Sequence, residues 1–122
     1  MGAFRVIIVT DRFDESVSFY SDAIGLPTVD DWDDVQGRGR IVRAFGDGCI
    51  ELMDRGVPTG PITIGMEIGV PADVDAFATT LTSRGVEIAD RPADQPWGHR
   101  NTAVIDPNGH RLIFWAPLTS SD

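Results

Sequence analysis

The sequence predicts an α+β fold in which a unit of about sixty residues occurs twice along the 122-residue chain. Each half opens with an apolar run typical of a strand and continues into a helical pattern. The glycines that would follow these two helices, Gly25 and Gly85, are sixty positions apart. Each half then ends in a predicted hairpin. Because neither half can bury a sizeable core alone, we expect one domain over 1–122, with modules at about 1–56 and 60–122.

The first module begins with a strand over 5–9, where four consecutive β-branched residues follow Arg5. A helix comes next, with Asp14 as its predicted N-cap and Gly25 as the left-handed residue after its C-terminus. The inner face of this helix carries four apolar residues at helical spacing, namely Phe13, Val17, Tyr20 and Ile24.

The second module repeats this order. A strand is predicted over 62–70, and a helix that begins at Pro71 and Asp73 is closed by Gly85. Residues 54–61, which contain two prolines and two glycines, form a natural linker between the modules. The inner stripe of the second helix consists of Val74, Phe77 and Leu81.

The hairpin at the end of each module is identified by its turn residues. In the second hairpin, Pro107 suits the first central position of a turn and Gly109 tolerates a positive φ. Each module therefore consists of a strand, a helix and then two or three further strands. The hairpin strands are predicted over 39–45 and 49–53 in the first module and over 101–105 and 111–115 in the second.

The charge balance excludes several classes of partner. Nineteen acidic and ten basic residues give a formal charge of −9, which repels nucleic-acid phosphates, so no nucleic-acid partner is expected. No apolar run approaches the roughly 18 residues of a membrane-spanning helix, so no membrane partner is expected. The N-terminus shows no signal-peptide pattern, and the single cysteine, Cys49, gives no sign of a disulfide scaffold. We therefore expect a cytoplasmic protein.

Three segments carry a family resemblance: 16–26 (SVSFYSDAIGL), 95–100 (QPWGHR) and 106–115 (DPNGHRLIFW). In this order they resemble the vicinal oxygen chelate superfamily, also called the glyoxalase/bleomycin-resistance/dioxygenase superfamily, and most closely its bleomycin-resistance branch. The resemblance covers nearly the whole chain. It implies tandem βαβββ modules whose curved mixed sheets surround a cleft, and a homodimer.

The resemblance also implies four metal-ligand positions, which fall near Phe4, on Glu51, near Gly65 and on Ile113. Only Glu51 carries a donor, and one carboxylate does not hold a divalent ion because affinity needs several convergent ligands. If Glu67 faced the cleft as well, the two carboxylates would make only a weak oxygen site. We therefore expect no metal and no other cofactor.

The remaining polar candidates have ordinary structural explanations. His99 follows the Trp-Gly of a loop and His110 belongs to a hairpin turn, so both are predicted to be surface residues. Cys49 lies in an apolar strand and is predicted to be a buried, inert thiol.

Tryptophans are the best candidates for ligand contact. Trp97 lies in a polar loop, and the resemblance implies that a Pro-Trp-Gly tryptophan stacks on the planar rings of bleomycin-type drugs; capping the sheet is its alternative role. Trp32 lies among four aspartates within 30–34, which together suit a cationic ring, although such a charge run is more often a solvated loop. Trp115 lies in a predicted terminal strand and belongs either to the hydrophobic core or to the wall of the cleft. The predicted ligand-binding residues are Trp97, Trp32, Trp115, Glu51 and Arg100.

These observations favour metal-independent binding and sequestration of a small cationic or planar aromatic molecule, as in bleomycin-resistance proteins. The alternative is an enzyme of the same superfamily. It would be either a metal-dependent lyase or dioxygenase with displaced ligands, or a metal-free isomerase with Glu51 as general base. Glu51 is otherwise explained by an ion pair with Arg43 or another strand arginine. A regulatory ligand sensor is a third interpretation.

Overall fold

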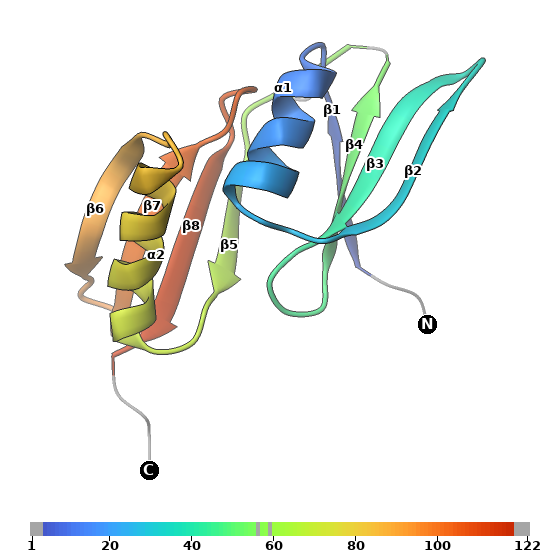
Figure 1. The fold of residues 1–122 in the computed structure, drawn as a ribbon. Coiled ribbons are helices and arrows are strands. Elements are labelled where there is room, and N and C mark those ends of the chain that lie inside the picture. The colour runs from blue at the N-terminus through green and yellow to red at the C-terminus, as the bar shows by residue number, and fades with distance from the viewer. Residues whose placement is uncertain (1–3, 56, 59, 119–122) are drawn as a thin grey trace. The chain divides into compact units, whose positions relative to one another are not determined.

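A computed structural model describes residues 4–55, 57–58 and 60–118, and the chain divides into two compact units, 1–61 and 62–122 (Figure 1). Each unit contains a four-stranded mixed sheet and one helical segment, in the order strand, helix, strand, strand, strand. The predicted α+β class with two βαβββ modules is confirmed.

The sheet of the first unit has the strand order β1-β4-β3-β2. Strands β1 and β4 are parallel, whereas the other neighbours are antiparallel. The helix α1 continues directly into a π-helical segment, η1, and packs against β4. The elements are β1 (Arg5–Val9), α1 (Phe13–Val17), η1 (Ser18–Ala23), β2 (Thr28–Asp34), β3 (Gly37–Arg43) and β4 (Cys49–Asp54).

The first helix begins two residues earlier than the predicted N-cap implied. Asp14 was predicted as its N-cap, but Arg12 occupies that position and its side chain makes no capping bond. The reason is local: Thr10 Oγ1 accepts the backbone N–H of Arg12 at 2.8 Å, which fixes the entry turn. The Asp14 carboxylate instead forms an ion pair with Arg38 at 3.0 Å. Gly25 follows the helix with φ 86°, as predicted.

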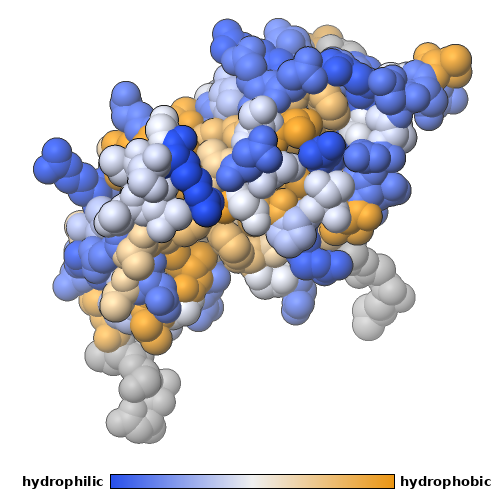
Figure 2. All heavy atoms as spheres, viewed as in Figure 1, coloured by the Kyte–Doolittle hydropathy of each residue, from blue (hydrophilic) through white to orange (hydrophobic). Residues whose placement is uncertain are grey.

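The acidic run 30–34 forms strand rather than the solvated loop that such runs usually make. Strand β2 pairs with β3 so that Asp31 lies opposite Arg40 and Asp33 opposite Arg38. Opposite charges across a strand pair are stabilising, and charged side chains protect an edge strand from further pairing. Figure 2 shows strongly hydrophilic residues gathered over this hairpin.

The sheet of the second unit has the corresponding order β5-β8-β7-β6, with β5 and β8 parallel. Helix α2 packs against β6, β7 and β8, and Phe77 of the helix meets Phe114 edge to face at 4.8 Å between ring centroids. Among the described residues no helix has the length and hydropathy needed to cross a membrane. The elements are β5 (Thr63–Glu67), α2 (Pro71–Ser83), β6 (Ile88–Asp94), β7 (His99–Ile105) and β8 (Arg111–Pro117).

The ends of α2 agree with the sequence pattern. The helix begins at Pro71, and Asp73 Oδ2 accepts the backbone N–H of Val70 at 2.9 Å. Gly85 follows the helix with φ 83°. The strand before the helix is shorter than the predicted 62–70, because Gly69 has φ 107° and turns the chain out of the sheet.

His110 was predicted at the surface and is fully buried, with 0% of its area exposed. Its Nδ1 accepts the backbone N–H of Ile62 at 3.0 Å, and its own backbone N–H donates to Asp106 Oδ1 at 2.7 Å. The turn at 106–109 therefore folds the imidazole inward, where it fixes the start of the second unit. The predicted burial of Cys49 is confirmed.

Candidate ligand-binding site

Strand alternation divides the side chains of the second sheet between two faces. One face packs against α2 and contains the buried Phe114. The opposite face, which we call the distal face, carries the alternate residues of β8 and the residues of β7 that lie opposite them. Its central members are Asn101, Ala103, Arg111, Ile113 and Trp115.

The distal face contains a hollow of about 480 Å³, formed by β6, the β6–β7 loop, β7 and β8. Volumes of a few hundred Å³ are typical of small-molecule sites. Trp97 belongs to the lining and is 63% exposed, so a large part of its indole is available for contact. The lining of the hollow includes Asp90, Arg91, Trp97, Asn101, Ala103, Arg111 and Ile113.

An ion pair between Asp90 and Arg111 borders the hollow. Asp90 lies on β6 and Arg111 on β8, so their side chains meet across the intervening strand β7. Each charge is thus satisfied by the other. The hollow therefore combines one exposed aromatic ring, small apolar residues and a neutralised charge pair with the polar side chains of Arg91, Gln95 and Asn101.

Trp115 lies on the distal face but outside the lining of the hollow. Its indole stacks on the imidazole of His99, with ring centroids 4.0 Å apart and planes at 14°. A Cβ at Gly65 would lie 3.7 Å from the indole Nε1, so the ring extends toward β5. His99, which was predicted at the surface, is part-buried through this stack.

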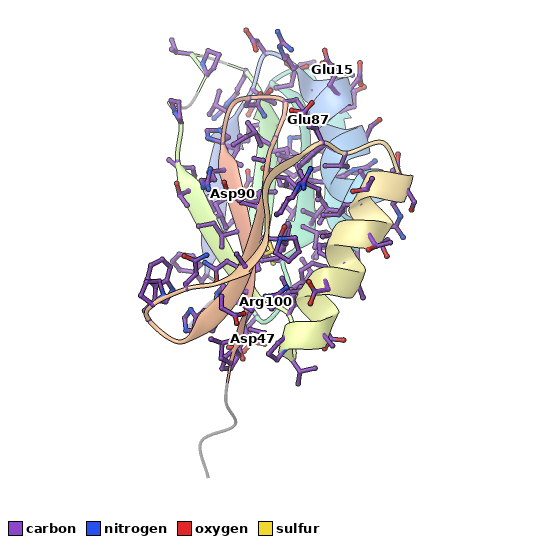
Figure 3. All side chains as sticks on the ribbon, turned by 90° about the vertical axis from the view of Figure 1, so that its left-hand side faces the viewer. Glu15, Asp47, Glu87, Asp90 and Arg100 are labelled. Atoms are coloured by element: carbon purple, nitrogen blue, oxygen red, sulfur yellow. The ribbon has the colours of Figure 1, made fainter. Side chains whose placement is uncertain are left out.

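Arg100 lies on the other face of β7 from Asn101, toward α2 (Figure 3). Its guanidinium binds Asp75 of α2 through two hydrogen bonds of 2.8 and 3.0 Å, and Asp94 of β6 through a third of 2.8 Å. The hydrogen bond from Arg100 lowers the pKa of Asp75, and these partners raise the pKa of Arg100. These contacts tie α2 to the sheet, and a ligand-binding role for Arg100 stays a prediction.

Glu51 lies at the centre of the first sheet, paired with Ile7 on one neighbouring strand and Ile41 on the other. The residue is 8% exposed, and its Oε1 accepts a hydrogen bond from Arg5 Nη1 at 2.8 Å. The strand arginine that satisfies this carboxylate is therefore Arg5, rather than Arg43.

Trp32 lies on the same face of the first sheet as Glu51, by strand alternation and register. It pairs with Gly39, where an added Cβ would lie 2.0 Å from the indole Cζ2, so the ring lies directly on the glycine backbone. Asp31 and Asp33 point to the opposite face because they alternate with Trp32. The indole is therefore not enclosed by all four aspartates of the run.

The metal-ligand positions implied for this fold do not suit a divalent ion. Phe4 lies just before β1, and strand register places Ile7 beside Glu51 and Gly65 beside Ile113, so none of these residues adds a second donor. Within the described ranges there is no group of three or more His, Cys, Asp or Glu side chains that could hold a metal. The Glu51 carboxylate is already paired with Arg5. The residues at these positions therefore do not fit a divalent metal ion.

We expect the purified protein to carry no stoichiometric transition metal, because Glu51 offers a single carboxylate that an arginine already engages. Elemental analysis after dialysis measures this directly. Retention of about one zinc, nickel, manganese or iron ion per chain, lost in Glu51→Ala, would contradict the expectation.

Asn101 was not identified from the sequence, although a signal was present. Within the predicted strand 101–105, an amide at the first position shares a face with Ala103. A polar side chain on the apolar face of a strand needs a partner, which marks it as a candidate contact for a ligand.

Comparisons with known proteins agree with this architecture. Residues 2–114 match the family model described as Glyoxalase/Bleomycin resistance protein/Dioxygenase superfamily, and the chain belongs to this superfamily. A search of curated proteins found no match.

Solved structures of the same fold cover 94–100% of the chain. A glyoxalase/bleomycin resistance protein/dioxygenase from Nocardioides has a TM-score of 0.77 at 22% identity, over 100% of this chain and 87% of that one. TnmS3, an antibiotic binding protein from Streptomyces sp. CB03234, has a TM-score of 0.79 at 25% identity, over 96% of each chain. Lactoylglutathione lyase from Agrobacterium tumefaciens has a TM-score of 0.76 at 18% identity, over 94% and 92%.

Proposed function

We propose that the protein binds and sequesters a small cationic or planar aromatic molecule without a metal ion, as members of the bleomycin-resistance branch of its superfamily do. The observation that carries this proposal is the hollow on the distal face, with the exposed indole of Trp97 in its lining. An exposed aromatic ring beside a concave surface offers a flat ligand both stacking and burial. The similarity to TnmS3, an antibiotic binding protein, supports the same function.

Charge favours a cationic ligand. The chain has a formal charge of −9, and such a field attracts cations at low ionic strength. Sequestration requires no chemistry, because tight binding alone lowers the free concentration of the molecule. We expect the affinity for a cationic ligand to fall as salt screens this field. The homodimer implied by the resemblance stays a prediction.

The enzyme alternative receives less support from the site. A metal-dependent lyase or dioxygenase needs a set of donors that the positions beside Glu51 and Ile113 do not provide. A metal-free isomerase with Glu51 as base would first have to break the hydrogen bond from Arg5. The similarity to a lactoylglutathione lyase, at 18% identity, supports the fold alone. Use of the same binding site in a regulatory sensor remains compatible with the proposal.

Trp97→Ala is expected to weaken the binding of a cationic planar aromatic by about 1–3 kcal/mol, roughly 5- to 150-fold, because it removes the stacking surface. Trp97→Phe should lose less, since a phenyl ring still stacks. Isothermal titration with bleomycin and with proflavine measures both variants against the wild type.

The thermal melt of each Trp97 variant provides the control. Because the indole is 63% exposed, the alanine variant should melt close to the wild type. If the tryptophan only caps the sheet, Trp97→Ala will melt earlier yet bind both compounds as the wild type does. That outcome would remove Trp97 from the site.

A further inference from the structure

Strand β7 carries a buried side-chain oxygen that has no hydrogen-bond partner among the described residues. Asn101 Oδ1 is buried and has no hydrogen-bond partner among residues 4–55, 57–58 and 60–118. An unpaired buried amide oxygen is costly, so native proteins keep few of them. Such a group indicates either stored strain or a partner that binds from outside.

The position of Asn101 favours an external partner. Two other side chains in the described part of the chain have a comparable unpaired atom, at Arg40 Nε and His110 Nε2, and neither belongs to the lining of the distal hollow. Asn101 does belong to it, together with the exposed Trp97. A ligand that stacks on the indole therefore brings its edge close to an amide that needs a partner.

The lining also contains the polar residues Arg91, Gln95 and Thr102, but within the described part of the chain Asn101 is its member with a buried polar atom that lacks a partner. Ala103 and Ile113 offer no hydrogen bonds, and the charges of Asp90 and Arg111 satisfy each other. The terminal torsion of asparagine is broad, so the carboxamide turns toward a ligand at little cost.

We propose that Asn101 determines the ligand specificity of this site by accepting a hydrogen bond from an N–H or O–H group at the edge of a planar ring system. This inference rests on the proposed function and narrows the ligand class to amino- or hydroxy-substituted aromatics. A site built to pair with such a group rejects an analogue that lacks it, because the buried amide oxygen is then left without a partner.

Two planar cations test the proposal. Proflavine carries amino groups at the ring edge, whereas N-methylacridinium has the same ring system and charge but no N–H donor. We expect the wild type to prefer proflavine by about tenfold or more, which is the effect of one good hydrogen bond. Asn101→Ala should abolish the preference for proflavine, whereas Trp97→Ala should weaken the binding of both compounds and keep the preference.

A failure of the proposed function and a failure of the role of Asn101 give different results. If the wild type binds neither compound, the proposed function is contradicted and the inference falls with it. If the wild type binds both equally, or if Asn101→Ala keeps the preference, only the role of Asn101 is overturned.

Stability provides a readout that needs no ligand. Asn101→Leu removes an unpaired amide and should raise the melting temperature by about 2–4 °C. Thr102→Val is the matched control on the same strand, because Thr102 Oγ1 donates to the Asp90 carbonyl at 2.7 Å; its melting temperature should fall. A fall in Asn101→Leu as well would show that the amide serves the fold, and would overturn the proposal.

Discussion

His110→Ala is expected to lower the free energy of unfolding by about 2–4 kcal/mol, which makes it one of the two most damaging substitutions that we predict. The imidazole is fully buried, so its removal leaves a cavity. Its loss also leaves the backbone N–H of Ile62, bound at 3.0 Å to Nδ1, without its acceptor. Urea unfolding monitored by circular dichroism measures the loss as a lower midpoint at an unchanged slope.

His99→Ala is the matched control, because it truncates the same type of side chain at the start of β7, where the ring is part-exposed. The His99 imidazole is part-exposed and makes one stack with Trp115, so its loss should cost less than about 1 kcal/mol. Equal losses in the two variants would show that the buried contacts of His110 contribute nothing beyond those of a surface ring.

The fold was predictable from the sequence because its determinants are local. Gly25 and Gly85 end the two helices with positive φ, and Gly109 with φ 90° completes the turn that the sequence indicated. The repetition of strand, helix and hairpin at a spacing of sixty then implies two similar sheets. None of these features depends on contacts between distant residues.

The errors arose where distant contacts decide the structure. The acidic run 30–34 contains too few apolar residues to predict a strand, yet pairing with Arg38 and Arg40 on the next strand makes it one. His110 follows a turn, where exposure is the usual outcome, and its burial depends on the backbone of Ile62, 48 positions away.

The candidate site was predictable in part, because strand register determines which side chains share a face. Trp97 was identified by its loop, which needs no register. Arg100 and Asn101 are adjacent in sequence but face opposite sides of β7, toward Asp75 and toward the hollow respectively. Motif matching selected Arg100 and not its neighbour Asn101, since the identity of a residue does not indicate its face; the role of Arg100 in binding stays a prediction.

Phe114→Ala is expected to lower the free energy of unfolding by about 3–5 kcal/mol, the usual cost of deleting a buried phenyl ring. Phe114 is fully buried and meets Phe77 of α2 edge to face. Its neighbour Trp115 points to the distal face, where it is part-exposed and stacks on His99. Trp115→Ala should therefore cost only about 1–2 kcal/mol, although it deletes the larger side chain.

This inverted order tests the assignment of the two faces of β8, on which the candidate site depends. Conservative variants separate lost packing from general disruption: Phe114→Leu should recover most of the stability, and Trp115→Phe should keep the stack on His99. Urea unfolding of the four variants ranks them. If Trp115→Ala costs as much as Phe114→Ala, the distal face is itself a packed core, and the hollow beside Trp97 is not a site for a ligand.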